Sequence, residues 1–416
     1  MKAIAAVVAC LLAAWVCVRE DALPAQHVHA HDPGAHTHAQ HEHGGETHTH
    51  HHSAVDAELA RHFVAPSSRG ELEELLVAAE ESHHGHGVNS NAESFLALLA
   101  ALPVAQRSAD PIRLGTGRHT YEWVSEWCQL PADMKLGNTH GAVLVNGAGE
   151  VLFNTDSRNA VMAFERGGRY LRSFAPECAG GAHGMVTTRE NDSEILWLAH
   201  TGRHEVLKLD RAGKVLSTLA WPEASGHYTK KEEFNPTSVA VAPDGSIFVA
   251  DGYGRSWVHR YSAAGQWLSA FGGPGAEPGR MHTPHGLLLD TRTTPPTLLV
   301  ADRENHRLQR FDLEGKFMSV ISGDLRRPCK MSLHESDIAV ADLAGRVTIL
   351  DKDGKLVTHL GDQPDEALRA NNGVPREKWK DGEFLAPHGL SFDSEGNLYI
   401  MDWLSLGRVT KLQRVK

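Results

Sequence analysis

The sequence has few cysteines, few basic residues for its length and, beyond its start, no long apolar run. Of the five cysteines in 416 residues, two lie in the first apolar run, and Cys128, Cys178 and Cys329 remain. An odd number cannot form a complete set of intrachain disulfides, although any single bridge stays open. The 41 Lys and Arg residues are outnumbered by 52 Asp and Glu residues. This balance argues against a nucleic-acid or anionic-membrane surface.

The single long apolar run covers residues 3–18, after Lys2, and ends at the charged residues 19–21. A membrane-spanning helix requires ~20 residues, and this shorter run is typical of an export signal. We therefore predict a signal peptide over residues 1–25, with cleavage after Ala25. The protein is then exported, which means secreted, periplasmic or at the cell surface. The alternative is an uncleaved N-terminal anchor.

Two segments follow the signal and differ from the rest of the chain. Residues 26–53 are rich in histidine and contain almost nothing that could form a core. This tract is expected to be a disordered linker, and its neutral imidazoles are suited to binding divalent Zn, Cu or Ni. Residues 54–110 have helix-forming residues with an apolar spacing near 3.6, which predicts two or three short helices or a linker.

From residue 111 the pattern changes to short apolar runs separated by glycine-containing turns. Each unit contains four runs with strand character, and the turns read PDG, SEG, LEGK or KDGK. Repeats of about 40 residues with four strands are the signature of propeller blades. We predict an all-β, six-bladed β-propeller over residues 111–416. Its units are 139–174, 182–219, 236–271, 284–321, 328–360 and 387–416.

The last unit ends after its third strand, at Lys416. A propeller has to close its ring or leave sheet edges open. The stretch 119–130, which precedes the first unit, has strand character. We predict that it supplies the missing outer strand of the last blade.

The first strand of each blade lines the central channel of a propeller, so equivalent positions form a ring around its axis. Three neutral imidazoles with an open position are the usual catalytic zinc set. The alternative is that His-Gly is only a turn preference at the entry to each strand. The ring positions are His140, His183, Thr237, His285, Cys329 and His388.

The blades resemble NHL repeats and are similar to the peptidyl-α-hydroxyglycine α-amidating lyases. The resemblance covers about residues 180–416. The motifs that carry it are FNPTSVAVAPDGSIFVADGYGRS (234–256), PGRMHTPHGLLL (278–289), VADRENHRLQRF (300–311) and APHGLSFDSEGNLYIMD (386–402).

The resemblance implies a zinc site, a catalytic tyrosine and a lyase reaction. The zinc ligands of the family fall on His183, His285 and His388. Tyr253 matches the catalytic tyrosine and Arg303 an arginine of the same site. The implied reaction cleaves the C–N bond of a peptide-derived or small carbinolamide and gives an amide and glyoxylate. His140 and Cys329 are additional channel residues, with His140 a fourth ligand or a supporting group.

Three positions depart from the family. The first-blade arginine should fall near residues 154–156, but only Arg158 is close and it is out of register. Gly389 stands where the family places an aspartate that binds structural calcium, which argues against calcium here. Gly254 replaces a disulfide cysteine. A relative with an altered substrate is therefore also consistent with the sequence.

An aspartate ends the second strand in five of the six units. The aspartates that end the second strands are interpreted as blade-to-blade hydrogen-bonding groups. The alternative function is a non-enzymatic propeller that binds a protein or handles metal through its histidine-rich arm. The aspartates are Asp156, Asp251, Asp302, Asp342 and Asp402.

Overall fold

The computed structural model describes residues 41–43, 46–48 and 110–415. The chain divides after Ala105 into two units. In the first unit, β1 (His41–His43) pairs with β2 (Glu46–His48) in an antiparallel hairpin within the tract expected to lack structure. The predicted signal, the rest of that tract and the helices expected before residue 110 lie outside the described residues.

The second unit contains six antiparallel sheets, which are the blades of a propeller. Blade 1 contains β5 (Thr139–Val145), β6 (Val151–Thr155), β7 (Val161–Phe164) and β8 (Tyr170–Phe174). Blade 2 contains β9 (Ala182–Glu190), β10 (Ser193–His200), β11 (Glu205–Leu209) and β12 (Val215–Leu219). Blade 3 contains β13 (Ser238–Val241), β14 (Ile247–Ala250), β15 (Trp257–Tyr261) and β16 (Trp267–Gly272).

The remaining blades follow the same order. Blade 4 contains β17 (Pro284–Asp290), β18 (Thr297–Asp302), β19 (Arg307–Phe311) and β20 (Phe317–Ile321). Blade 5 contains β21 (Pro328–His334), β22 (Asp337–Asp342), β23 (Arg346–Leu350) and β24 (Leu356–Leu360). Blade 6 contains β25 (Pro387–Phe392), β26 (Leu398–Asp402), β27 (Arg408–Arg414), β4 (Tyr121–Val124) and β3 (Arg113–Leu114).

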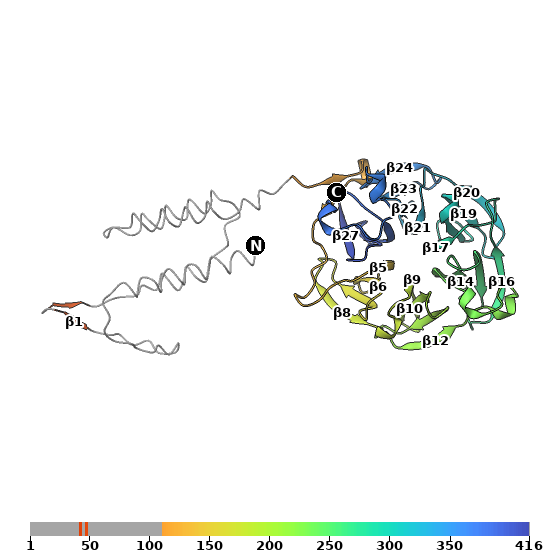
Figure 1. Cartoon of the computed structure of the whole chain (residues 1–416), viewed down its shortest axis with the longest axis horizontal. Helices are drawn as coiled ribbons and strands as arrows, with labels where there is room; N and C mark the ends of the chain where they lie inside the picture. Colours follow the sequence, from red (N-terminus) through yellow and green to blue (C-terminus); the bar gives the residue numbers. More distant parts are fainter. Residues whose placement is uncertain (1–40, 44–45, 49–109, 416) are drawn as a thin grey trace. The chain divides into compact units, whose positions relative to one another are not determined.

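The blades form a closed ring, with first strands toward the centre and fourth strands at the outer edge (Figure 1). First strands of successive blades contact one another in the order β5, β9, β13, β17, β21, β25 and back to β5. The predicted all-β six-bladed propeller is confirmed. Within the described residues the only helices are short 3-10 turns, and none could cross a membrane.

The turns between third and fourth strands explain the regular spacing of the units. In three blades, an aspartate Oδ1 accepts main-chain N–H groups two and four residues later, at 2.8 to 3.0 Å. The glycine of each turn has a φ between +76° and +89°, which glycine adopts without steric cost. The aspartate-glycine pairs are Asp210 and Gly213, Asp312 and Gly315, and Asp351 and Gly354.

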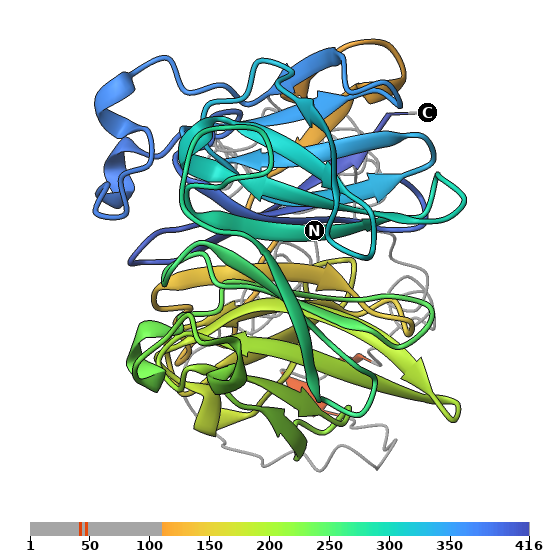
Figure 2. The ribbon, with the colours of Figure 1, turned by 90° about the vertical axis from the view of Figure 1, so that its right-hand side faces the viewer.

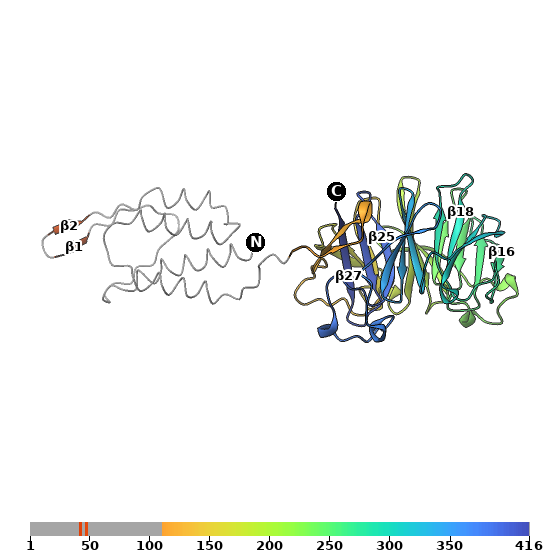
Figure 3. The same ribbon diagram turned by 90° about the horizontal axis from the view of Figure 1, so that it is seen from above.

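The hydrophobic core is divided among the six interfaces between neighbouring blades. The main clusters join blades 1 and 2, 2 and 3, 3 and 4, 4 and 5, 5 and 6, and 6 and 1. The strands run across the thickness of the ring, as the edge-on views show (Figures 2 and 3). Each blade is therefore held by apolar packing on both of its faces.

Blade 6 closes the ring with strands from both ends of the propeller. β4 pairs with β27 in antiparallel register, from Val124 opposite Lys411 to Tyr121 opposite Arg414. This confirms the strand predicted within residues 119–130, and β3 adds a further strand outside it. Tyr121 is fully buried, and Trp123 packs with its ring centroid 4.9 Å from that of Phe384.

Replacing Trp123 with alanine should weaken the ring closure. Trp123 is 7% exposed, and removing a buried tryptophan side chain costs about 3–5 kcal/mol of unfolding free energy. Leu406→Ala is the control, because Leu406 is 57% exposed and surface changes usually stay within about 0.5 kcal/mol. Urea unfolding followed by tryptophan fluorescence and circular dichroism measures both variants. Equal losses would contradict a specific role for the closing strand.

Candidate functional site

Three of the ring histidines are oriented in the same way by the neighbouring blade. Their Nδ1 atoms lie at hydrogen-bond distance from main-chain carbonyl oxygens of the next first-strand segment. His183 Nδ1 is 2.6 Å from the Thr237 oxygen, His285 Nδ1 is 3.0 Å from that of Cys329, and His388 Nδ1 is 2.8 Å from that of Gly141. A carbonyl only accepts, so Nδ1 carries the proton in each ring and Nε2 is left with a free lone pair.

His388 has a second contact that tests this tautomer. The Gly141 N–H lies 3.3 Å from His388 Nδ1, longer than the 2.8 Å to the Gly141 carbonyl. The shorter contact favours Nδ1 as the donor. The Nε2 atom of His388 is buried and has no hydrogen-bond partner within the described residues. A buried acceptor without a partner carries a desolvation cost. A metal ion bound to this nitrogen would offset that cost.

The glycine after each of these histidines makes that contact possible. A Cβ atom on Gly184 would lie 2.4 Å from the Thr237 oxygen, and one on Gly286 would lie 2.2 Å from the Cys329 oxygen. A Cβ on Gly389 would lie 2.9 Å from the Gly141 oxygen. These are the same carbonyls that bind the imidazoles. The His-Gly step is thus explained by close approach between blades, and the backbone at 389 leaves no room for an aspartate.

The other ring positions behave differently. Thr237 Oγ1 donates to the main-chain oxygens of Ala250 and Pro284 and so serves the backbone. His140 is half-buried, and its ring centroid lies 4.8 Å from that of His183 and 4.7 Å from that of His388. Cys329 is fully buried. Cys128, Cys178 and Cys329 are all free thiols.

Five side chains at the channel form two sets whose nitrogen or sulfur atoms lie within 4.8 Å of one another. The first set is His140, His183 and His388, and the second is His285, Cys329 and His388. The predicted ligand trio is divided between these sets and joined by His388. Its ring centroids are nevertheless close, at 5.0 Å for His183 and His285, 4.9 Å for His183 and His388, and 4.6 Å for His285 and His388.

Tyr253 brings a hydroxyl group to the same place. It lies on the loop between β14 and β15, and its hydroxyl is 2.9 Å from His285 Nε2 and 3.3 Å from His183 Nε2. The residue as a whole is 36% exposed, but its hydroxyl lies among buried imidazoles. Arg303 begins the 3-10 turn η5 (Arg303–Asn305), and its guanidinium donates to the Tyr253 hydroxyl at 3.4 Å. The sequence-predicted pair therefore meets the histidines.

Burial determines the protonation of the site. It lowers the pKa values of His183, His285 and His388 well below 6.5, so these imidazoles are neutral at pH 7. Burial raises the pKa of Tyr253 to about 12, although the nearby charge of Arg303 opposes this rise. Burial also raises the pKa of the Cys329 thiol to about 11. The site thus holds neutral nitrogen donors beside a fixed guanidinium charge.

Two cationic residues beside the site were not found from the sequence. Arg327 shares Glu304 with Arg303, at 2.6 Å and 2.8 Å, and its positive charge also opposes the raised pKa of Tyr253. Lys330 donates to the Leu287 carbonyl at 3.4 Å, and burial lowers its pKa to about 8. The sequence did contain a signal for Lys330. A glycine follows each ring histidine, whereas Lys330 follows the ring cysteine.

The residues at the predicted departures have structural roles. Asn154 is buried, and its Oδ1 accepts the main-chain N–H of Ala142 at 2.8 Å. Arg158 is exposed. A Cβ on Gly254 would lie 2.1 Å from Asp251 Oδ1, so a cysteine does not fit there.

The aspartates that end second strands bond within their own blade, which corrects the prediction of blade-to-blade bonds. Four of them accept main-chain N–H groups from the segment that enters the same blade: Asp251 from Asn235, Asp302 from His282, Asp342 from Arg326 and Asp402 from Leu385. The fifth, Asp156, accepts from the side chain of Asn138. Each carboxylate therefore fixes its own entry loop.

Comparison with known proteins adds relatives, although no family model matches the chain. A probable peptidyl-alpha-hydroxyglycine alpha-amidating lyase of Caenorhabditis elegans is 34% identical over 136 residues, or 31% of this chain and 36% of that protein. Peptidyl-alpha-hydroxyglycine alpha-amidating lyase 1 of Drosophila melanogaster is 27% identical over 241 residues, or 53% and 42%. The peptidyl-glycine alpha-amidating monooxygenase of Mus musculus is 33% identical over 126 residues, or 29% and 13%.

These matches cover less than half of each relative, and together with the six-bladed fold they agree with the resemblance indicated by the sequence. Among solved structures, a streptogramin B lyase has a TM-score of 0.49 at 14% identity and covers 70% of this chain and 97% of its own. A gluconolactonase of Xanthomonas campestris has a TM-score of 0.49 at 16% identity and covers 74% and 95%.

Adding a methyl group at Gly286 should disturb the ring. Gly286→Ala would force the Cys329 carbonyl away from a Cβ placed 2.2 Å from it, and such overpacking typically costs about 1–3 kcal/mol. Gly167→Ala is the control, because a Cβ there meets nothing within 4 Å. Chemical unfolding compares the two variants. An unchanged midpoint for Gly286→Ala would contradict the packing argument.

Proposed function

We propose that this chain is an exported, zinc-dependent lyase of the amidating type. It would cleave the C–N bond of a carbinolamide and release an amide and glyoxylate. The observation that carries the proposal is the Tyr253 hydroxyl, which lies between the Nε2 atoms of His183 and His285 and accepts from Arg303. The relatives named as amidating lyases support it.

The histidines fit a zinc ion by their chemistry. His183, His285 and His388 are neutral at pH 7 and are held through Nδ1, as zinc-binding histidines commonly are. Their Nε2 lone pairs face the channel, where those of His183 and His285 meet the Tyr253 hydroxyl and that of His388 has no partner within the described residues. These three would hold the ion, with His140 and Cys329 as further donors in the two sets. Zinc bound there would supply a Lewis acid for the substrate hydroxyl oxygen and positive charge that favours the Tyr253 phenolate.

The protein's own residues would carry the substrate and the proton. Arg303 and Arg327 provide guanidinium groups next to Tyr253, and Arg303 is suited to holding the substrate carboxylate. Tyr253, as phenolate, would accept the proton of the α-hydroxyl group. The O–H electrons then form the aldehyde C=O of glyoxylate while the C–N bond breaks. The amide nitrogen takes the electron pair and receives the proton from Tyr253, which restores the phenolate.

The protein would act outside the cytoplasm on a substrate that contains a carbinolamide. A peptide or small carbinolamide would be the substrate, and the N-terminal run would direct export. The histidine-rich tract would collect divalent metals outside the propeller. The non-enzymatic alternative differs in two respects, because it requires the tract and gives no role to the Tyr253 hydroxyl.

Zinc binding at the channel should depend most on His388, because both sets contain it. We expect His388→Ala to retain about one zinc ion fewer per chain than the unchanged protein, as a single four-coordinate site requires. Both are full-length chains, so metal on the histidine-rich tract cancels in the difference. Elemental analysis after gel filtration gives the counts. His334→Ala, which changes a half-buried histidine bonded to Arg414, should leave the count unchanged. Equal counts for His388→Ala and the unchanged protein would refute the site.

Catalysis should depend on the Tyr253 hydroxyl. With zinc-loaded protein and an α-hydroxyglycine peptide, Tyr253→Phe should lower kcat about 10²- to 10⁴-fold, the usual contribution of a general base, while zinc content stays the same. Tyr170→Phe is the control, since Tyr170 begins the outer strand of blade 1. A colorimetric assay for glyoxylate measures the rates. Release by Tyr253→Phe at the unchanged rate would remove the proposed role.

A further inference from the structure

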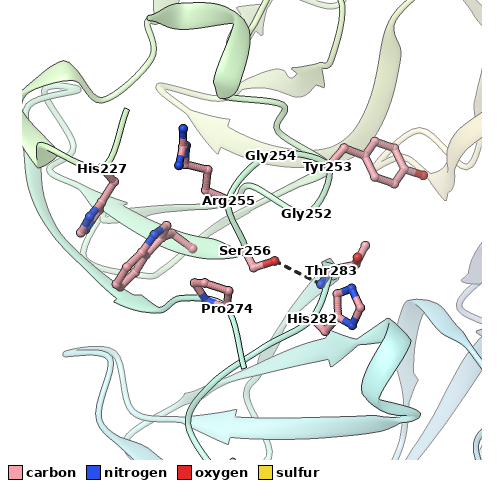
Figure 4. Close-up of a pocket in the computed structure, with 10 residues that line it drawn as sticks. His227, Gly252, Tyr253, Gly254, Arg255, Ser256, Pro274, His282 and Thr283 are labelled. Atoms are coloured by element: carbon pink, nitrogen blue, oxygen red, sulfur yellow. Dashed lines mark hydrogen bonds between the residues drawn. The ribbon is translucent and has the colours of Figure 1, made fainter. Parts of the chain in front are cut away.

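A cavity of about 690 Å³ is lined by Tyr253 and by none of the ring histidines. Its walls come from the loop after β14, from the segment before β13 and from the segment before β17. Figure 4 shows the Tyr253 ring directed away from the other labelled residues. Tyr253 therefore belongs to the cavity wall and to the histidine site at once. Its lining includes His227, Tyr253, Arg255 and Trp257.

The wall of this cavity includes a tryptophan at a position that an arginine occupies in blades 4, 5 and 6. In blades 4, 5 and 6, the first residue of the third strand is an arginine that pairs with the aspartate ending the second strand. In blade 3 the first residue of β15 is Trp257, so Asp251 has no such partner. The arginine pairs are Arg307 with Asp302 at 2.8 Å, Arg346 with Asp342 at 3.3 Å and Arg408 with Asp402 at 3.0 Å.

Neutral donors replace the arginine at Asp251. The Tyr228 hydroxyl donates to Asp251 at 2.7 Å, and the main-chain N–H groups of Asn235 and Arg255 donate at 2.7 and 2.6 Å. His259 lies 2.7 Å from the Tyr228 hydroxyl and extends this network. Burial raises the pKa of Asp251 to about 6, as expected for a carboxylate without a paired cation. Because these donors satisfy the Asp251 carboxylate, the residue at position 257 does not have to pair with it.

Trp257 instead contributes an aromatic surface to the cavity. Its ring stacks on His227 with centroids 3.9 Å apart and planes 7° apart. The one guanidinium in the lining, that of Arg255, is paired with Glu233 at 2.7 Å. The surface that a ligand meets is thus a stacked aromatic pair beside a neutralised charge.

We propose that this cavity binds the substrate residue immediately before the reacting glycine and prefers an aromatic or apolar side chain there. The inference rests on the proposed function, because that function places the reacting carbon beside the Tyr253 hydroxyl. The rest of a peptide would then extend along Tyr253 toward Trp257 and His227. Stacking on an aromatic face strengthens binding about two- to tenfold, which is enough to select among substrates.

The test compares two substrates and one designed variant. Trp257→Arg gives blade 3 the arginine of blades 4 to 6, so Asp251 gains a partner while the cavity loses its aromatic wall. The substrates are N-acetyl-phenylalanyl-α-hydroxyglycine and N-acetyl-α-hydroxyglycine, which lacks the preceding residue. For the first, Trp257→Arg should raise KM about three- to tenfold. For the second, KM should change less than about twofold, and kcat should hold for both.

Controls separate this inference from the proposed function. Trp257→Phe keeps an aromatic ring and should retain the preference for the phenylalanyl substrate. If Trp257→Arg changes KM equally for both substrates, or for neither, the subsite is wrong while the lyase function stands. If the unchanged protein releases no glyoxylate from either substrate, the lyase function fails. Calorimetry with N-acetyl-phenylalanyl-glycine then tests whether the cavity binds the phenylalanyl residue. The unchanged protein should bind this peptide, and Trp257→Arg should not. Equal binding to both proteins would overturn the subsite.

Discussion

The close approach of neighbouring first strands is the constraint on which the site depends. Where Gly184, Gly286 and Gly389 follow a histidine, a Cβ atom would lie 2.2 to 2.9 Å from a carbonyl oxygen of the next blade. The missing side chain lets that oxygen reach the imidazole Nδ1 and fix the ring. Apolar clusters at all six blade interfaces hold the strands at this separation. Orientation of the histidines is therefore a property of blade packing rather than of loops.

The same aspartate position serves two purposes in different blades. In blades 4 to 6 it pairs with the arginine that begins the third strand, and it also accepts main-chain N–H groups of its own entry loop. In blade 3, Asp251 uses Tyr228 and main-chain donors, and its hydrogen bonds fix the loop that carries Tyr253. The guanidinium groups of Arg303 and Arg327 oppose the rise that burial causes in the pKa of the Tyr253 phenol. The Asp251 carboxylate thus fixes the loop that places Tyr253 beside Arg303.

The repeat length in the sequence was sufficient to predict the fold. The equivalent position in the first strand of each blade was sufficient to predict which side chains lie at the channel. The spacing of the units predicted six repeats and histidines at equivalent ring positions, and the missing fourth strand of the last unit predicted the closing strand near residues 119–130. The choice of His183, His285 and His388 among the ring residues came from the family resemblance, and their rings do lie close together. Distances between blades are not encoded in spacing, so the role of each glycine, the division of the ligands into two sets and the bonds of the aspartates within their own blades required coordinates. The cavity at Trp257 was missed because it depends on a difference between blades rather than on the repeat.

The pairing of β4 with β27 also has a consequence for how the molecule is made. β4 precedes blade 1 in the sequence and β27 belongs to blade 6, so during synthesis β4 is made long before its partner strand. Blades 1 to 5 can assemble in order as they emerge, but the ring closes only when β27 pairs with β4. His388, which both sets of donor atoms contain, lies in that final blade. The channel is therefore complete only after β25 to β27 of blade 6 have been made.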